Sequence, residues 1–348
     1  MEITAGGRFE VRITPADVGK RVSVRRLSPE RDGTGTFTDT VGVLASWDEG
    51  VLVITRRTGE TVHIAESTLV AGKIVPPAPA RRRGPAATFE ELARASARAW
   101  QPVEAEALGD WQLRAAAGFT RRANSVLPLG DPGISLDDAL ARVTAWYAER
   151  GLPAYVQVAT GAAGTQEVLC AELERRGWVR EVSAEVRIAA LAPIADVAAD
   201  LSAVRLSRTA DAAWMGRYQR SGEPAPEVAQ VLGAGPSVWF ASVVEGGEGG
   251  EGAGAGEVLA IGRCVVDGRW AGFMAVEVAP EQRRRGLATA VMAALSRQAL
   301  AEGASAAWLQ VEADNGGAQG LYEGLGFAAH HAYHHFRAPS GDASGTAP

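Results

Sequence analysis

The sequence predicts a protein of the α+β or α/β class, in which a small all-β barrel precedes a duplicated folding unit. Two observations favour this class. Residues 8–75 contain short strand-like runs separated by polar turns, with little helical periodicity. Residues 88–191 and 203–338 then repeat one order of predicted helix, strand, helix and turn. A repeat of this length indicates that a folding unit has been duplicated.

The length, charge and cysteine content of the chain exclude several classes of function. The chain has 348 residues and a net charge of −6, so we expect two domains or more and no broad basic face for nucleic acid. The acidic balance favours a cationic partner. Cys170 and Cys264 are too few for a disulfide framework or a metal site, and we expect both to be buried. Because no apolar run approaches bilayer length and the start lacks a signal-peptide pattern, we predict a cytoplasmic protein with no membrane partner.

The N-terminal part alternates apolar and polar residues at 21–27, 51–55 and 61–64. This pattern predicts an SH3-like barrel of about five strands over residues 8–75. Residues 76–87 form a stiff linker rich in Pro and Arg. Arg81, Arg82 and Arg83 fit a solvated tether, and contact with an anionic partner stays open.

An apolar strand beginning at Val276 leads through three arginines at 283–285, Gly286 and Ala288 directly into a helix. A helix start presents unbonded backbone N–H groups and the positive end of its dipole, which together attract phosphate. The small residues keep side chains away, and the arginines add charge with a geometry suited to phosphate. This stretch therefore predicts a pyrophosphate site.

A second motif follows the strand at 307–311: Asn315, Ala318, Tyr322 and Phe327 stand in the order Asn-x-x-Ala-x-x-Leu-Tyr-x-x-x-Gly-Phe. Together with the loop at 283–288, this run resembles the signature of the GNAT superfamily of acetyl-CoA-dependent N-acetyltransferases. The two halves of the signature occur in the same order, and the strand and helix that each motif needs surround them.

The resemblance implies the GNAT fold, a mixed central sheet flanked by helices, with acetyl-CoA as cosubstrate and a primary amine as acceptor. It implies that Tyr322 is the general acid for the CoA sulfur. It also implies that the backbone of Val276 and Val278 bonds the pantetheine arm and supplies an oxyanion donor. The implied cofactor-binding residues are Val276, Val278, Arg283, Arg284, Arg285, Gly286, Leu287, Ala288, Thr289, Asn315 and Ala318.

The residue at the usual position of the general base differs from the family pattern. Many GNAT members place Glu or His early in the central strand, and Gly272 stands at that position here. Glu277 on the same strand and Glu312 at the end of the next strand are the nearby carboxylates. Glu277 is our candidate catalytic base, although a surface or structural role stays open for each.

The first unit, at 88–191, looks degenerate. Its loop carries Asp131, which would repel phosphate, and Leu173 stands where the second unit has Tyr322. The stretch around residues 118–125 resembles tandem actinobacterial-type acetyltransferases that carry an N-terminal barrel. Within it, Arg121, Arg122 and Asn124 either reach an acceptor across the unit boundary or serve strand pairing.

Four of the five histidines lie close together near the C-terminus: His330, His331, His334 and His335. Neighbouring side chains on a strand point to opposite faces, so we predict a strand and no metal site. His63 also fits a packing or surface position in a strand. The Gly-rich run at 245–256 and the tail at 339–348 are predicted to be disordered from their composition.

The sequence thus favours an N-acetyltransferase whose second unit is catalytic and whose acceptor is a small-molecule or protein amine. An alternative is a regulatory protein that senses acetyl-CoA and recruits an unknown partner through the barrel; the missing carboxylate at Gly272 supports it. A third interpretation, a nucleic-acid adaptor, would use the barrel with the linker arginines.

Overall fold

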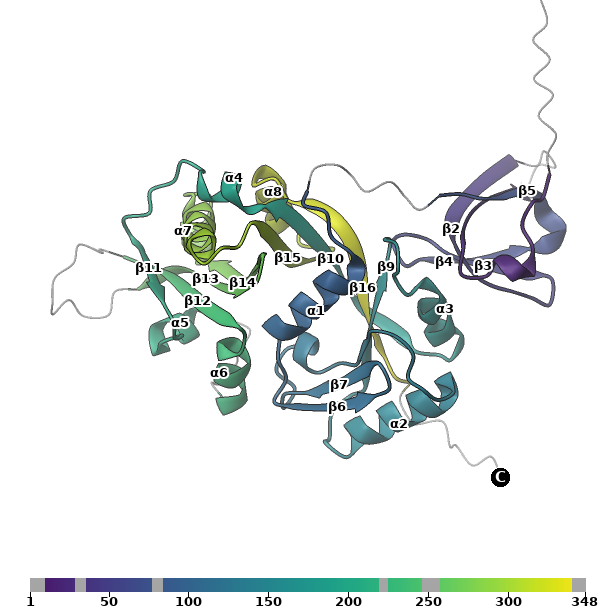
Figure 1. Ribbon diagram of the computed structural model, residues 1–348, viewed down its shortest axis with the longest axis horizontal. Coiled ribbons are helices and arrows are strands. Elements are labelled where there is room, and N and C mark those ends of the chain that lie inside the picture. The colour runs from purple at the N-terminus through teal and green to yellow at the C-terminus, as the bar shows by residue number, and fades with distance from the viewer. Residues whose placement is uncertain (1–9, 29–35, 77–83, 219–224, 246–256, 340–348) are drawn as a thin grey trace, which may run out of the picture.

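The computed structural model describes residues 10–28, 36–76, 84–218, 225–245 and 257–339 (Figure 1). The strands within these ranges form an N-terminal sheet of five strands, a side sheet of three and a central sheet of eight. The linker arginines at 81–83 and nearly all of the Gly-rich run and the tail, which we predicted to be disordered, lie outside the described residues.

The N-terminal sheet is antiparallel throughout, in the order β4-β3-β2-β1-β5. Its strands are β1 (Arg21–Ser28), β2 (Thr36–Asp48), β3 (Val51–Thr55), β4 (Thr61–Ala65) and β5 (Leu69–Ile74). Alternating residues point to one face, where Val22, Leu44 and Ile54 are fully buried. Strand alternation therefore builds a separate small core here.

After a short edge strand, the second unit has a meander of three antiparallel strands, and the next strand, reached through a helix, is parallel to the last of these three. These strands are β12 (Ser237–Val244), β13 (Val258–Asp267), β14 (Trp270–Val278) and β15 (Ala306–Glu312), with β11 (Val204–Ser207) at the edge. The connecting helix is α7 (Leu287–Ala301), and α8 (Gly316–Gly324) leads to the last strand, β16 (Ala328–Arg337).

The first unit repeats this order. Its elements are β6 (Glu104–Leu108), β7 (Trp111–Ala115), β8 (Leu127–Pro128), α2 (Leu136–Ala148), β9 (Tyr155–Thr160), α3 (Glu167–Arg175) and β10 (Val179–Ala190). β6, β7 and β8 form the side sheet, and Val126 beside β8 bridges Val156 of β9 in the parallel sense. The duplication that the sequence predicts is confirmed by this shared order.

The two units interleave instead of standing side by side. The central sheet has the order β11-β12-β13-β14-β15-β10-β16-β9, so each unit's last strand lies between two strands of the other unit. β10 and β16 also pair with each other, and both run through the middle of the molecule (Figure 1). Neither unit can therefore complete its sheet alone.

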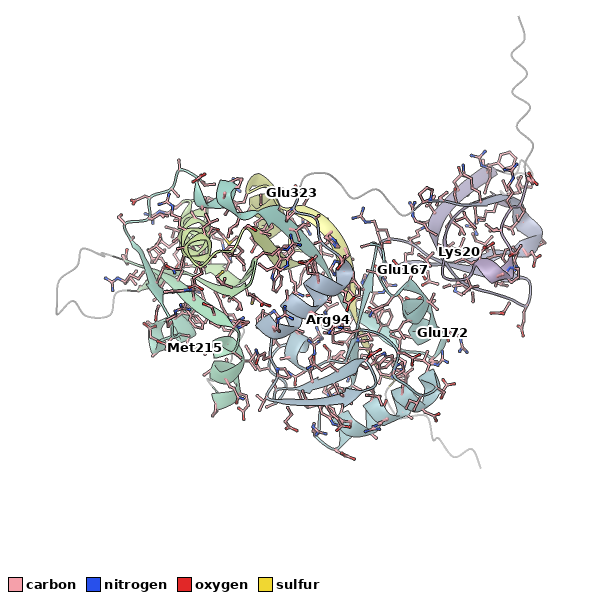
Figure 2. The ribbon with its side chains drawn as sticks, viewed as in Figure 1. Lys20, Arg94, Glu167, Glu172, Met215 and Glu323 are labelled. Atoms are coloured by element: carbon pink, nitrogen blue, oxygen red, sulfur yellow. The ribbon has the colours of Figure 1, made fainter. Side chains whose placement is uncertain are left out.

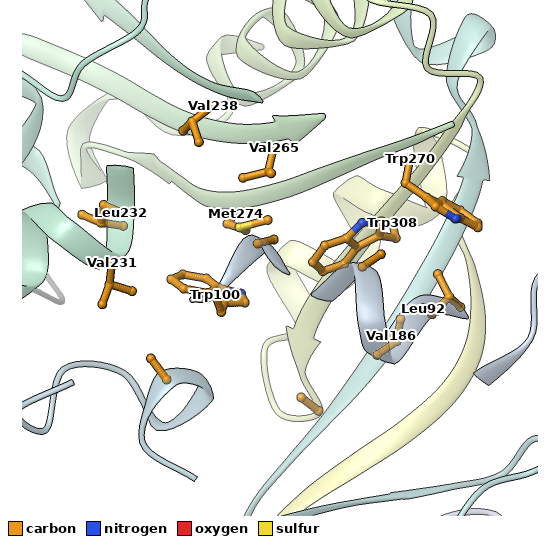
Figure 3. Packing of buried hydrophobic residues seen from close by; sticks show 14 of the residues in the cluster. Leu92, Trp100, Val186, Val231, Leu232, Val238, Val265, Trp270, Met274 and Trp308 are labelled. Carbon is orange, nitrogen blue, oxygen red and sulfur yellow. The ribbon is translucent and has the colours of Figure 1, made fainter. Parts of the chain in front are cut away.

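Helices cover both faces of the second unit's half of the sheet. α7 and α4 (Leu191–Ala195) share one buried cluster with the strands. α1 (Phe89–Ala99), α5 (Ala212–Arg217) and α6 (Pro226–Gly233) contribute to the cluster on the opposite face, shown in Figure 3. α2 and α3 cover the first unit's strands. Among the described residues, no helix has the length and apolar character needed to cross a bilayer.

The N-terminal sheet is docked on the first unit through the turn between β3 and β4. The hydroxyl of Thr160 donates to the carbonyl of Arg57 at 3.0 Å, and Arg180 donates to the carbonyl of Gly59 at 2.6 Å. At the start of α3, the Glu167 carbonyl accepts from the Thr55 hydroxyl at 3.2 Å (Figure 2). Backbone groups thus fix this sheet against the interleaved units.

Candidate active site

A cleft opens where β14 and β15 separate. The two strands pair only from Trp270 opposite Ala306 to Phe273 opposite Leu309. Beyond that point Ala275 adopts a φ of 50°, at the register shift between β13 and β14. Such a bulge bends a strand away from its neighbour. The remainder of β14 stays bonded to β13 and turns its other edge towards the cleft.

The cleft is a pocket lined by residues from both units. The strands β14 and β15 and the segment that starts α8 contribute Glu277, Glu312, Asn315, Ala318 and Tyr322. Trp100 after α1, Arg122 of the first unit and Tyr218 after α5 also line the pocket. The remaining lining residues are Phe273, Met274, Ala275, Val276, Gln310 and Val311. The pocket therefore lies at the junction of the two units.

Tyr322 belongs to the core and to the pocket at once. It is only 9% exposed, and its ring meets that of Phe327 edge-on at 5.9 Å. It also lines the cleft. The packed ring holds the side chain in one orientation, which a proton donor requires, so the packing role and the predicted acid role are compatible.

Asn315 starts α8. Its side-chain oxygen accepts the backbone N–H of Ala318 at 3.1 Å, as an N-cap does. This bond uses the side-chain oxygen, so the amide N–H₂ and the backbone are the groups that Asn315 presents to the pocket. Ala318 lies in the first turn and has no side chain beyond Cβ to fill the cleft.

The predicted phosphate loop leads from a 3-10 turn, Pro280–Gln282, into α7. Gly286 has a φ of 80°, and Arg284, at 65°, also occupies the left-handed region that favours glycine. The first bond within the helix runs from the N–H of Ala290 to the carbonyl of Gly286. The N–H groups of Leu287, Ala288 and Thr289 therefore have no acceptor in the helix.

The charges of the loop face solvent. Arg283, Arg284 and Arg285 are all exposed. Arg285 donates to the side-chain oxygen of Gln282 within the loop. Exposed guanidinium groups beside unbonded helix N–H groups form a surface suited to an anionic diphosphate. Val278, at the end of β14, lies between this loop and the pocket.

Comparisons with known proteins agree with this arrangement. Residues 86–336 match the family described as "Probable histone acetyltransferase Rv0428c C-terminal". The chain belongs to this family. A probable histone acetyltransferase of Mycobacterium tuberculosis (strain ATCC 25618 / H37Rv) is 33% identical over 166 residues, which are 48% of this chain and 52% of that protein. The chain thus spans about half the length of this relative.

A solved structure confirms the GNAT fold. The GCN5-related N-acetyltransferase from Kribbella flavida is similar to this chain with a TM-score of 0.53 at 16% identity, covering 73% of this chain and 97% of that chain. At this level of identity the likeness establishes the fold, and activity needs its own argument.

The absence of a side chain at position 272 has a steric reason. A Cβ at position 272 would overlap the indole ring of Trp308, which is 1% exposed. The space that a Glu or His would need is therefore filled by tryptophan. Glu277 and Glu312, the two carboxylates named from the sequence, both line the pocket.

The first unit's equivalent cleft is mostly filled, and only a small cavity remains beside Leu127, Ala159 and Gln166. Its helix α2 is capped by Ser135, whose hydroxyl accepts the N–H of Asp138 and donates to the Asp138 carboxylate at 2.6 Å. Gln166 spans the gap between β8 and β9, because it donates to the carbonyl of Pro128 and accepts the N–H of Ala159 at 2.8 Å. Leu173 is fully buried. A capped helix and a bridged cleft leave no pantetheine-sized opening there.

Of the two roles that the sequence left open for Arg121, Arg122 and Asn124, strand pairing does not apply. Arg121 and Arg122 lie in a 3-10 turn, Arg121–Ala123, and Asn124 ends it. Asn124 accepts the N–H groups of Ala116 and Gly118, so it fixes the loop. Arg121 pairs with Glu181 at 2.7 Å, and only Arg122 of the three reaches the pocket. A polar run without apolar alternation was a signal for a turn.

Sequence reasoning missed Trp100, Tyr218 and Gln310, which also line the pocket. Their neighbours in sequence give no motif, because each reaches the pocket from a different part of the chain. Trp100 lies beside Met274 and Trp308 in the buried cluster (Figure 3).

Three of the C-terminal histidines and both cysteines are packed inside the fold. His331, His334 and His335 are buried within the central sheet. His334 lies between the hydroxyls of Thr160 and Ser183, at 3.0 and 2.8 Å. No group of three or more metal-ligating side chains occurs in the part of the chain that the structure describes. Cys170 and Cys264 are buried, and burial raises the pKa of the Cys170 thiol to about 12.

Proposed function

We propose that the protein is an acetyl-CoA-dependent N-acetyltransferase that works in the cleft of its second unit. The observation that carries this proposal is that three features adjoin β14: the strand edge that opens where its pairing with β15 ends, a pocket that contains Tyr322, and the start of α7 with its unbonded N–H groups. They suit the pantetheine arm, the sulfur and the diphosphate of acetyl-CoA, respectively.

The bound cosubstrate supplies an activated acetyl group. Its diphosphate would lie on the N–H groups of Leu287, Ala288 and Thr289, with charge from the arginines at 283–285. The backbone of Val276 and Val278 would bond the pantetheine arm, and Asn315 would contact it from α8. A β14 N–H would donate to the acetyl oxygen as negative charge develops there, an effect typically worth about 3 kcal/mol.

Two protons must move. The amine nitrogen forms a bond to the acetyl carbon as the carbon–sulfur bond breaks; the nitrogen loses a proton and the sulfur gains one. Tyr322 is our candidate proton donor to the sulfur. Glu277 is our candidate base, acting directly or through water, and Glu312 is the second carboxylate within the same pocket.

The acceptor is a primary amine of a small molecule or of a protein. The relative's name, probable histone acetyltransferase, makes lysine-containing peptides one class to include. The test is CoA release from acetyl-CoA with a panel of amines and lysine peptides. We expect turnover that Tyr322→Phe reduces by about 100-fold, with CoA affinity unchanged, since general acid catalysis contributes about 10² to 10⁴.

The second candidate is an acetyl-CoA sensor, with the N-terminal sheet as its partner-binding module. It is favoured by one observation, the exclusion of a carboxylate from position 272 by Trp308. Tight CoA binding without turnover on any amine would favour the sensor. Loss of CoA binding altogether would contradict both candidates.

A further inference from the structure

We propose that Arg122 binds an anionic group of the acceptor, and that the acceptor is therefore a small amine that also carries a carboxylate. This inference rests on the proposed acetyl transfer and names its substrate class. It reverses the expectation, drawn from net charge, that the acceptor is cationic. The charged groups that contact the acceptor decide its preferred charge, because screening leaves distant surface charges with little effect.

Arg122 reaches the pocket from the first unit. The residues proposed to hold the cosubstrate belong to β14, α7 and α8, so Trp100, Arg122 and Tyr218 are the lining residues left to contact the acceptor. Among the described residues that line this pocket, Arg122 carries the positive charge, and Glu277 and Glu312 carry the negative charges. Trp100 and Tyr218 are aromatic, so Arg122 is the one of these three acceptor-side residues that can pair with an anion.

The guanidinium is held in place by its aromatic neighbours. Its Nε donates to the hydroxyl of Tyr333 at 2.8 Å, and its Cζ lies 5.8 Å from the Tyr333 ring centre and 5.9 Å from that of Trp100. Within the described residues, no carboxylate lies within 4.0 Å of its nitrogens. The terminal nitrogens keep the fork geometry that a carboxylate bonds with two parallel hydrogen bonds.

Its neighbour in the same turn shows the contrast. Arg121 is paired with Glu181 at 2.7 Å and lies over the ring of Tyr155 at 5.1 Å, outside the pocket. One turn therefore holds a surface arginine that is paired with Glu181 and a pocket arginine that has no carboxylate within 4.0 Å among the residues the structure describes. The acceptor that satisfies both the pocket arginine and the acetyl-transfer site has an amine at one end and a carboxylate at the other.

The test uses three acceptors of one length: 4-aminobutyrate, 4-aminobutanamide and 1,4-diaminobutane, with shorter and longer homologues of each. They share the reacting amine and differ only in the charge at the far end. We expect kcat/KM to be highest for the carboxylate, by about tenfold to hundredfold over the amide, the range for a hydrogen bond to a charged group. The diamine should be the poorest.

Arg122→Gln should remove this preference by raising KM for the carboxylate far more than KM for the amide. Arg121→Gln is the matched control and should leave the preference intact. Tyr333→Phe keeps the charge but frees the guanidinium, so it should raise KM for the carboxylate by a smaller factor. A circular dichroism spectrum and the CoA affinity of each variant check that it is folded.

Calorimetric titration of the same ligands into CoA-saturated protein separates this inference from the proposed activity. Tighter carboxylate binding that Arg122→Gln abolishes supports the inference even if no amine is acetylated. Equal binding of the three ligands, a preference that survives Arg122→Gln, or a lysine peptide that outcompetes the aminocarboxylates would overturn it.

Discussion

Gly272 and Trp308 show how one close contact shapes the site. A side chain at 272 has no room, so the absence of a carboxylate from the family position is built into the packing of the core. The carboxylates of the cleft instead come from Glu277 and Glu312, farther along the two separating strands.

Gly272→Ala should lower the free energy of unfolding by about 1–3 kcal/mol, because the new Cβ overlaps the buried Trp308 ring and the core must shift. Urea unfolding measures the change. Gly320→Ala is the control, since a Cβ there meets nothing within 4 Å and alanine favours a helix. A Gly272→Ala variant as stable as the wild type would show that the ring moves aside.

Two buried histidines make stability depend on pH. Burial lowers the pKa of His331 and of His334 from 6.5 to about 3. Below pH 6.5 the unfolded chain takes up protons at both sites and the folded protein does not, so the free energy of unfolding falls as pH drops from 6.5 towards 3. At pH 5 the loss is about 2 kcal/mol for each histidine. Unfolding curves that coincide at pH 7.5 and pH 5 would contradict this account.

α2 and α7 occupy equivalent places in the two units and differ at their first residues. Ser135 and Asp138 close the start of α2, whereas Gly286 gives α7 no side-chain cap. The clefts of the two units differ in the same way. Gln166 bridges the cleft of the first unit, whereas the cleft of the second unit contains the pocket. Both copies of the duplicated unit thus have the same fold, and only the second copy has an open cleft between its strands.

This contrast predicts one CoA per chain, measured as a stoichiometry of 1 by calorimetry. Gln166→Ala removes the bridge across the first cleft but leaves the α2 cap and Asp138 in place, so it should leave the stoichiometry at 1. Two sites of similar affinity in the wild type would contradict the filled first cleft.

The sequence could predict the local elements of the site but not its assembly. Gly286, Ala288 and Tyr322 lie within short motifs whose strand and helix context can be read from neighbouring residues. Trp100 and Tyr218 enter the pocket from distant segments, and no local period encodes that meeting. The exchange of β10 and β16 between the units cannot be predicted from the sequence for the same reason. Apolar and polar residues alternate in these strands as in others, and this alternation specifies which face is buried but not which strand pairs with which.

The molecule as a whole is held together by shared strands and by the docked N-terminal sheet. Gly59, with a φ of 81°, lies so close to His334 of β16 that a Cβ would overlap the imidazole ring. His334 is in turn held by Thr160 and Ser183 of the first unit. One turn of the N-terminal sheet thus contacts strands from both units.

Gly59→Ala should weaken this docking through backbone strain and overlap with His334, and should speed hydrogen exchange in β3, β4 and α3. We expect a loss of about 2–4 kcal/mol in the free energy of unfolding. Gly50→Ala is the matched control. Gly50 has a φ of 74° and a Cβ there meets nothing within 4 Å, so this variant measures the backbone strain without the overlap. Equal losses in the two variants would contradict a tight contact at His334.

The central claim is that the start of α7 binds the diphosphate of CoA, and calorimetry of CoA binding to Gly286→Val tests it most directly. Valine at a φ of 80° must distort the loop, although a Cβ there meets nothing within 4 Å. Gly303→Val is the control, because Gly303 follows the other end of α7 with a φ of 93° and open space. We predict that Gly286→Val weakens CoA binding by about tenfold or more while Gly303→Val leaves it unchanged. Unchanged affinity in Gly286→Val, or no CoA binding by the wild type, would contradict the account.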